Sequence, residues 1–401
     1  MNQIRKKTAE KIELNQFLIL LMSVANAICA ANLYYAQPLL SNLATYFHVS
    51  STVIGISATI IQIGFAIGLI FIVPLGDIVN QRSLILIMLS CSMAAVLELS
   101  FVTNVIWFII GSLFVGITSI TQMVLVTLAA HLANPASRGR VIGTVMTGLL
   151  IGMQLSRTFS GIIGTYYGWQ VVYQIAAVMI GILIIIFYFH LPQSSPDAVM
   201  SYGKLISSLG SILRKQPILR SSSLIGAMMF ASFSAFWTTL SFLLKSPAYN
   251  LGAQTAGMLG LIGAVGALAA SIAGRVVDKK GYYFTLTIGI SLSMAGYLCF
   301  WILGYQLWGL IWGIVLLSIG IQTAQISNQA KINTLDDILR SRNNGLYMAF
   351  YFIGGAIGSF LGSYLWGLSG WTGVCILGIT FQVIAVVTHF FENKHTTMTS
   401  N

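Results

Sequence analysis

The residue of this sequence with the clearest chemical potential is Arg157, within the apolar stretch "GLLIGMQLSRTFSGIIG" (148–164). No Asp or Glu occurs within ten residues on either side. An arginine in hydrocarbon costs about 3 to over 10 kcal/mol, so such a side chain usually faces a water-filled cavity or a partner. In a helix its nearest same-face neighbours are Gln154 and Gly161. The pattern predicts that Arg157 faces a cavity.

A desolvated guanidinium can bind a carboxylate or phosphate bidentately, which makes Arg157 a candidate counter-charge for an anionic substrate. Two alternatives remain open from the residues. The side chain could snorkel to the outer membrane interface, as long basic side chains near helix ends do. It could also pair with Glu98, the only other charge well inside an apolar run. Glu98 is itself a candidate proton-coupling site, the alternative being an interfacial carboxylate.

Further polar and aromatic residues fall at comparable depths in other apolar runs. Amides are costly in lipid unless they are hydrogen-bonded, so most should face the protein interior, where they bind substrate or bond neighbouring helices. Together with Arg157 and Gln154, the predicted substrate-binding residues are Asn32, Tyr34, Tyr35, Gln37, Gln122, Trp237, Gln322, Gln325, Asn328 and Tyr347.

Other chemistries have little support in the sequence. No pair of histidines or cysteines has metal-ligand spacing, so no metal site is expected. No glycine loop with lysine could cradle a nucleotide phosphate, and no nucleophile–base pattern stands out. We therefore expect neither a cofactor nor an enzyme.

The composition indicates a membrane protein. Hydrophobic residues make up 57% of the 401 residues and charged residues only 7%, whereas a soluble domain has about 25% charged residues. The net charge of +11 comes from short basic clusters between apolar runs, as in cytoplasmic membrane loops. Because there is no basic domain, a nucleic-acid partner is not expected.

The apolar runs predict an all-α protein with twelve membrane-spanning helices. Six spans are predicted near 17–46, 52–76, 83–102, 105–131, 139–165 and 170–190. Six more are predicted near 219–244, 253–275, 284–303, 305–330, 343–366 and 372–391. The predicted organisation is a six-helix half over 1–190, a cytoplasmic linker over 191–218 and a second six-helix half over 219–401.

The distribution of lysine and arginine predicts the orientation in the membrane. Eighteen of the 20 basic residues fall before the first predicted span or after even-numbered spans. By the positive-inside rule, both chain termini are expected on the cytoplasmic side of the inner membrane.

An internal repeat relates the two predicted halves. Arg138 and Arg140 recur 202 residues later as Arg340 and Arg342, and Gly168-Trp169 recurs at the same offset as Gly370-Trp371. Two parallel six-helix halves are a known transporter plan, with the substrate site between them near mid-membrane. Small residues also recur every fourth position, for example Gly148, Gly152, Ser156, Ser160 and Gly164, which predicts close helix packing.

Several stretches resemble a bacterial branch of the major facilitator superfamily near the drug–proton antiporters. "GRVVDKKG" (274–281) resembles the loop motif of that family, and "VPLGDIVNQRS" (73–83) is a degenerate first copy. "NLYYAQPLL", "FWTTL" and "NNGLYMAFYFIGGAIGS" add to the resemblance. It implies a role in closing the cytoplasmic gate for Asp77, Arg82, Gly274, Asp278, Lys279 and Gly281. The arginine that many proton-coupled exporters carry in their fourth helix is missing here.

The expected function is therefore secondary transport of a small organic solute by alternating access, with export implied by the resemblance. Arg157 favours an anionic solute such as an organic acid, a carboxylate siderophore or a phosphorylated metabolite. The alternative is a multidrug exporter of neutral or cationic amphiphiles, in which Arg157 is structural. The expected partners are the solute, the lipid bilayer and protons as a candidate coupling ion, and a monomer is expected.

Overall fold

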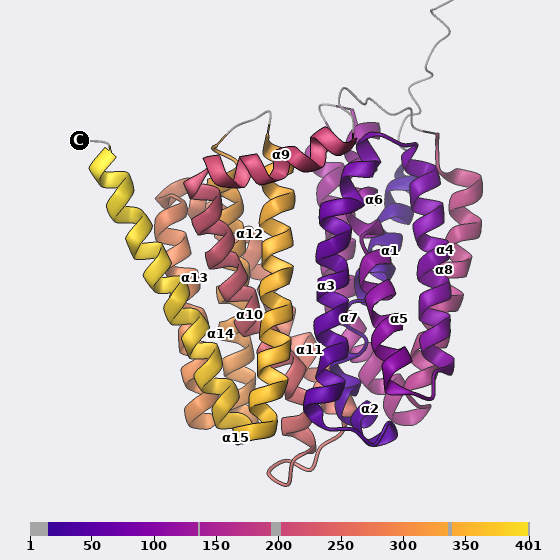
Figure 1. Ribbon diagram of the computed structural model, residues 1–401, viewed down its shortest axis with the longest axis vertical. Helices are drawn as coiled ribbons and strands as arrows, with labels where there is room; N and C mark the ends of the chain where they lie inside the picture. The colour runs from indigo at the N-terminus through magenta and orange to yellow at the C-terminus, as the bar shows by residue number, and fades with distance from the viewer. Residues whose placement is uncertain (1–14, 135–136, 194–201, 336–338, 400–401) are drawn as a thin grey trace, which may run out of the picture.

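The structure, a computed structural model, describes residues 15–134, 137–193, 202–335 and 339–399, except the side chains of Asp77 and of residues 393–399. In those residues the regular elements are all helices, without a strand. The helices stand side by side, with the purple elements of the first part of the chain on one side and the orange and yellow elements of the last part on the other (Figure 1).

We refer to α1–α8 as the N-half and to α10–α15 as the C-half. The N-half contains α1 (Gln16–Ala31), η1 (Gln37–Leu39), α2 (Leu40–Tyr46), α3 (Ser51–Phe71), η2 (Val73–Asp77), α4 (Gln81–Phe101), α5 (Val105–Thr118), α6 (Thr121–Leu132), α7 (Arg138–Tyr166) and α8 (Trp169–His190). The C-half contains α10 (Pro217–Lys245), α11 (Ala253–Gly263), α12 (Val265–Lys280), α13 (Tyr282–Leu303), α14 (Leu307–Ile332) and α15 (Arg340–Thr399). Helix α9 (Tyr202–Lys215) connects them.

These helices are consistent with the twelve predicted spans. Nine helices within the described ranges are long and apolar enough to cross a membrane. Helix α1 is a shorter apolar helix, and α7, which carries Arg157 and the stripe of small residues, is not among the nine. Adding α1 and α7 and dividing α15 into two is consistent with twelve spans. The division of α15 falls at Gly370, whose φ of 63° lies in the left-handed region that favours glycine.

Three predicted spans are interrupted rather than continuous. The span 17–46 ends as a helix at Ala31 and resumes after Pro38, which has no N–H to donate to a preceding turn. The span 105–131 is broken between α5 and α6, where the Thr118 and Ser119 hydroxyls donate to backbone carbonyls one turn earlier. Such back-bonding bends helices.

The break between α11 and α12 has a tertiary cause. The backbone carbonyl of Gly263 accepts a hydrogen bond of 3.1 Å from Nε2 of Gln154, which lies on α7 in the other half. A side chain that inserts into the hydrogen-bond ladder interrupts a helix at that point. The interruption therefore marks a place where the two halves are linked.

The small-residue stripes bring helices into backbone contact within each half. A Cβ built on Gly152 of α7 would lie 2.2 Å from the carbonyl oxygen of Ala27 on α1. In the C-half, a Cβ on Gly354 of α15 would lie 2.2 Å from the carbonyl oxygen of Ala227 on α10. Gly152 and Gly354 are 202 residues apart, so the sequence repeat is also a repeat of packing. Close approach of this kind is how helices associate in lipid.

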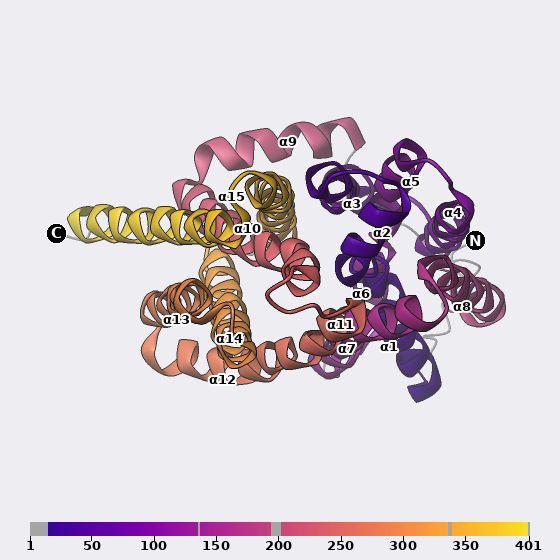
Figure 2. The same ribbon diagram turned by 90° about the horizontal axis from the view of Figure 1, so that it is seen from below.

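The two halves touch near the end of the bundle that carries α2, which we call the α2 end. A Cβ on Gly161 of α7 would lie 2.9 Å from the Cα of Gly257 on α11. A Cβ on Gly55 of α3 would lie 2.1 Å from Oγ of Ser363 on α15. These pairs are again related by 202 residues. In Figure 2, seen from below, α7 and α11 lie against each other.

The opposite end, which carries α9, lacks such contacts at its glycines. A Cβ on Gly143 of α7, Gly274 of α12 or Gly345 of α15 would meet nothing within 4 Å. At their glycines, the halves therefore pack closely at the α2 end and not at the α9 end.

Candidate functional site

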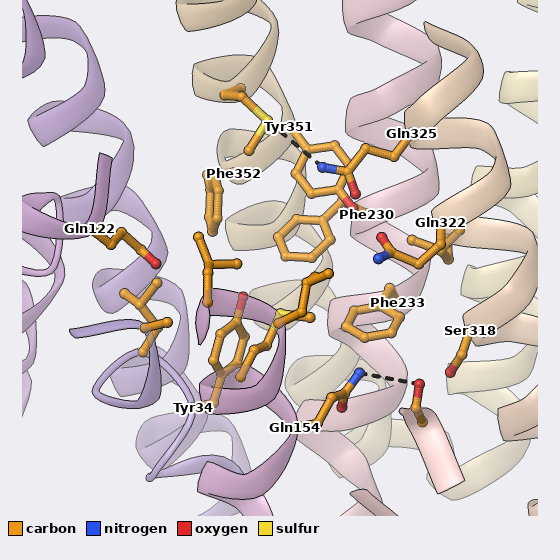
Figure 3. Close-up of a pocket in the computed structure, with 18 of the residues that line it drawn as sticks. Tyr34, Gln122, Gln154, Phe230, Phe233, Ser318, Gln322, Gln325, Tyr351 and Phe352 are labelled. Carbon is orange, nitrogen blue, oxygen red and sulfur yellow. Dashed lines mark hydrogen bonds between the residues drawn. The ribbon is translucent and has the colours of Figure 1, made fainter. Parts of the chain in front are cut away.

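A cavity lies between the two halves, lined by residues of both (Figure 3). From the N-half it is lined by Ala30, Leu33, Tyr34, Gln122, Met123, Leu149, Leu150, Met153 and Gln154. From the C-half it is lined by Phe230, Phe233, Gly263, Ser318, Ile321, Gln322, Gln325, Met348, Tyr351 and Phe352. Leu33 and Tyr34 lie in the turn between α1 and η1, and the other positions belong to α1, α6, α7, α10, α11, α14 and α15.

The wall of the cavity is apolar and aromatic, with amides at a few points. None of the residues named above as its lining is charged. The rings of Phe230 and Tyr351 are stacked, with centroids 4.1 Å apart and planes 18° apart, and Phe230 also stacks on Phe233. Apolar walls with a few placed polar groups are typical of sites for small organic molecules.

Arg157 lies behind this wall rather than on it. The side chain is fully buried (0% exposed). It lines a tight void next to Gln37, Pro38, Trp237, Leu240, Ser241 and Ala256. Tyr34 and Gln154 contact the guanidinium and also line the cavity, so these two side chains separate the cation from the cavity.

Neutral groups surround the guanidinium. Nε donates to Oε1 of Gln37 at 2.8 Å, and Nη1 donates at 3.2 Å both to Oε1 of Gln154 and to the carbonyl of Met153. Its Cζ lies 4.6 Å from the ring centroid of Tyr34 and 4.4 Å from that of Trp237. Aromatic faces attract a cation but do not neutralise its charge.

No carboxylate among the described residues lies within 4.0 Å of the Arg157 guanidinium. The Nη2 atom of Arg157 has no hydrogen-bond partner within the described part of the chain. Both alternatives to a cavity-directed role are therefore wrong in this conformation: Arg157 neither snorkels outward nor pairs with Glu98. Glu98 is only partly buried on α4, beside Gly111 of α5.

The structure separates the predicted binding residues into three groups. Those that line the cavity are Tyr34, Gln122, Gln154, Gln322 and Gln325. Those that surround the buried cation are Gln37 and Trp237. The others, all buried but outside the cavity lining, are Asn32, Tyr35, Asn328 and Tyr347.

Helix–helix contacts account for two of the residues outside the lining. Asn32 donates to Oγ of Ser92 on α4 at 3.4 Å. Tyr35 packs its ring against Phe159 of α7, with centroids 6.0 Å apart. Contact with a neighbouring helix was the alternative to substrate binding that the sequence left open for these residues.

Several lining residues are not among those predicted from the sequence. They are mainly Phe230, Phe233, Ser318, Met348 and Phe352. An aromatic pattern at helical spacing on α10 was the available signal, because Phe230, Phe233 and Trp237 lie three and four residues apart and so on one face. The same pattern is common in lipid-facing belts.

Arg157 has a counterpart in the C-half at a 202-residue offset, which is Ser359 of α15. Oγ of Ser359 lies 2.7 Å from Nε2 of Gln62 on α3, which donates to it. Oε1 of the same Gln62 accepts from Ser234 at 3.1 Å. Thr238 lies 2.9 Å from Oγ of Ser359. The four buried side chains form a hydrogen-bonded group that joins α3 of the N-half to α10 and α15.

Most of the predicted gating residues lie at the α9 end. Asp278 and Lys279 are exposed in the last turn of α12, rather than in the following loop, and Gly281 ends that helix with a φ of 83°. Gly274 meets nothing at its Cβ position. The Arg82 guanidinium lies over the ring of Tyr188, 5.8 Å from its centroid. The side chain of Asp77 lies outside the described residues. A gating contact therefore stays a prediction.

No group of three or more His, Cys, Asp or Glu side chains that could hold a metal ion occurs among the described residues. The candidate site is therefore the aromatic and amide-lined cavity with a buried cation behind it.

Comparisons with known proteins agree with this architecture. A sequence profile described as Major Facilitator Superfamily matches residues 22–339. The chain is 38% identical over 372 residues to a protein named putative uncharacterized transporter YgaY of Escherichia coli (strain K12), covering 93% of this chain and 94% of that one. It is 29% identical to the probable transporter SCO4007 of Streptomyces coelicolor (strain ATCC BAA-471 / A3(2) / M145), covering 91% and 85% of the two chains.

A solved structure shares the fold at low identity. It is a bacterial homolog of the human lysosomal transporter Spinster, in an inward-facing and unoccupied conformation, with a TM-score of 0.74 and 14% identity over 94% of this chain and 95% of that one. Together with the profile match, the helical bundle and the cavity between its halves, this likeness leads to one conclusion. The chain belongs to the Major Facilitator Superfamily and is a multi-pass membrane transporter.

Proposed function

We propose that the protein moves a small organic anion across the cytoplasmic membrane by alternating access, with Arg157 as the counter-charge. One observation carries the proposal. The guanidinium is fully buried, has neutral hydrogen-bond acceptors only, and leaves Nη2 without a partner among the described residues. A buried charge without a counter-charge costs several kcal/mol. A bound anion would remove that cost.

The lining of the cavity supports a substrate whose uncharged part is apolar or planar. Its stacked aromatic side chains, Phe230 and Tyr351, suit an apolar or planar body, and its glutamines can orient polar substituents. The described lining has no carboxylate that would attract a cation. The expected substrate is therefore an organic acid or phosphorylated metabolite with a substantial apolar part.

Gln154 provides a route by which the anion reaches Arg157. Its Oε1 accepts from the guanidinium, while its Nε2 donates to the carbonyl of Gly263 in the C-half. Rearrangement of the halves would break the bond to Gly263 and free the Gln154 side chain to turn away. The guanidinium would then face the cavity, so exposure of the charge is coupled to the conformational change.

Direction, orientation and coupling belong to the proposal as well. The distribution of basic residues favours a cytoplasmic location of both termini by the positive-inside rule. Export follows from the resemblance to drug–proton antiporters, and Glu98 is the candidate site for a coupled proton. Transport by inside-out membrane vesicles, with and without an imposed proton gradient, tests these points separately.

A second candidate function is export of neutral amphiphiles, with Arg157 structural. It is favoured by the three hydrogen bonds that already hold the guanidinium and by the layer of Tyr34 and Gln154 in front of it. In that case Arg157 links α7 to η1 through Gln37 and does not bind a charged group of the substrate.

A thermal-shift comparison with matched ligands distinguishes the two functions. Detergent-purified protein is screened against carboxylates, their uncharged amides and cationic analogues, because a ligand that binds only the folded state raises the melting temperature. We expect carboxylates to stabilise wild type and not a folded Arg157→Gln variant, while Arg82→Gln, at the α9 end, retains the effect. Stabilisation by amides or cations that persists in Arg157→Gln supports the amphiphile exporter instead.

A further inference from the structure

Helix α9 lies at the edge of the bundle and belongs to neither half (Figure 1 and Figure 2). In Figure 1 it crosses the end of the bundle, and in Figure 2 it lies at the outer edge, alongside α3 and α15. It therefore runs along the rim of the bundle. In a membrane-spanning bundle, the lipid headgroups of one leaflet surround the rim at this end.

One face of α9 packs on the protein and contacts both halves. Leu205 and Ile212 are buried, and the hydroxyl of Tyr202 donates to the carbonyl of Phe71, the last residue of α3, at 2.7 Å. Leu205 and Leu209 share a small apolar pocket with Leu69, Ile70, Val73 and Pro74 of the N-half and with Ser341, Arg342, Gly345 and Leu346 of the C-half.

The exposed side of α9 carries a basic face. Lys204, Arg214 and Lys215 are exposed, whereas Leu205 and Ile212 face inward. At 100° per residue, Lys204 and Lys215 fall within about 20° of each other, beside the buried face. Arg214 lies about 80–100° from them, opposite Leu205 and Ile212. No Asp or Glu occurs between residues 202 and 220, and none of the three cations has an ion-pair partner among the described residues.

An amphipathic helix with a basic polar face at a membrane surface is attracted to anionic lipid headgroups. We propose that the basic face of α9 binds anionic phospholipid headgroups of the adjacent leaflet, and that this binding holds α9 against both halves. The partner is chosen by charge complementarity and by the position of α9 at the rim. This inference is independent of the substrate that the cavity takes.

The consequence is a link between lipid composition and conformation. Helix α9 packs on α3 and on the start of α15, which belong to different halves. Headgroups that hold α9 in place stabilise this arrangement of the α9 end. Without anionic lipid, α9 should detach more often, and its backbone amides should exchange with solvent faster.

The test is amide hydrogen exchange on the full chain in nanodiscs. One set contains phosphatidylcholine alone, the other phosphatidylcholine with phosphatidylglycerol in equal parts. We expect exchange within residues 202–215 to slow by about tenfold or more in the anionic discs, given three cations near the surface. High salt should reverse the slowing, because it screens exposed charges.

Two variants decide whether α9 itself binds the lipid. Lys204→Gln/Arg214→Gln/Lys215→Gln should lose the lipid-dependent slowing. Arg140→Gln/Arg275→Gln/Lys280→Gln removes the same charge from exposed residues at the same end and should keep it. Equal exchange of α9 in both lipids, or equal loss in both variants, would overturn the proposal. Replacing phosphatidylglycerol with phosphatidylserine should give the same slowing if charge is what is recognised.

Discussion

Arg157 on α7 and Ser359 on α15 occupy equivalent positions in the two halves, 202 residues apart, and both lie where the halves meet. Ser359 bonds Gln62 of the opposite half. Arg157 packs its Cβ against Gly260 of α11, where a Cβ would lie 2.9 Å away. One equivalent position thus carries a hydroxyl that joins the halves, and the other carries a cation without a counter-charge. Because of this asymmetry, the proposed recognition of charge involves only the N-half position.

Supplying a carboxylate inside the protein should replace the proposed anion. In Gln37→Glu, the new carboxylate stands where Oε1 of Gln37 accepts from Nε of Arg157 at 2.8 Å. We expect a higher melting temperature in the absence of ligand and at least about tenfold weaker anion binding, because a buried pair satisfies the guanidinium. Thermal unfolding and ligand titration measure the two effects.

Gln37→Leu is the matched control, since it removes the acceptor without adding charge. It should lower stability by about 1–3 kcal/mol, the cost of an unsatisfied buried donor, while anion binding persists. If Gln37→Glu changed neither stability nor anion binding, Arg157 would not lack a counter-charge.

The contact between α7 and α11 should be sensitive to one added methyl group. In Gly257→Ala the Cβ would lie 2.5 Å from the carbonyl oxygen of Arg157. Overpacking of this kind costs about 1–3 kcal/mol, which should shift the protein toward states open at the α2 end. A Ser241→Cys reporter, in a background with the four native cysteines replaced, should label several-fold faster with a membrane-impermeant thiol reagent.

Gly274→Ala is the control for this prediction, because a Cβ there meets nothing within 4 Å. Its labelling rate should equal that of the parent. Equal rates in Gly257→Ala and Gly274→Ala would show that the contact does not hold the α2 end closed.

The hydrogen-bonded group at Ser359 should behave as a unit. Gln62→Leu and Ser359→Ala each break the 2.7 Å bond between the halves, and each should cost roughly 0.5–2 kcal/mol, the range for such bonds between membrane helices. The double variant should cost less than the sum, because the shared bond is lost only once. Additive losses in unfolding free energy would show that the two side chains do not act together.

The aromatic wall should set affinity through stacking rather than through the Tyr351 hydroxyl. Tyr351→Leu removes the ring that stacks on Phe230 with centroids 4.1 Å apart. We expect about tenfold weaker binding of an aromatic carboxylate, since an aromatic pair is worth roughly 0.5–1.5 kcal/mol beyond its area. Tyr351→Phe keeps the ring and should bind normally. A large loss in Tyr351→Phe would instead assign the hydroxyl to the substrate.

The fold could be predicted largely from the sequence because membrane spans depend on local apolarity and repeats on simple offsets. The interruptions could be predicted only in part. Pro38 marks one of them in the sequence, since proline has no N–H. The break after Gly263 depends on Gln154, 109 residues away, and no local pattern contains that contact.

The candidate site shows the same division. Arg157 stood out because a charge in an apolar run is rare, and its burial between the halves agrees with that signal. Its depth behind Tyr34 and Gln154 depends on side-chain packing that spacing cannot give. Likewise, Gln122 and Asn32 are both carboxamide side chains in apolar runs. Gln122 lines the cavity, whereas Asn32 donates a hydrogen bond to Ser92.

The most direct test of the central claim is a comparison of two isosteric solutes in proteoliposomes. Transport rates are measured for a carboxylate that stabilises the protein and for the uncharged carboxamide of that solute. The proteins compared are wild type, Arg157→Lys and Arg157→Gln. We predict that wild type prefers the carboxylate by about tenfold or more in kcat/KM, as expected for a bidentate charged contact. Arg157→Lys should keep part of that preference and Arg157→Gln none. If Arg157→Gln kept the wild-type preference for the carboxylate, the claim that Arg157 binds the charged group of the substrate would be contradicted.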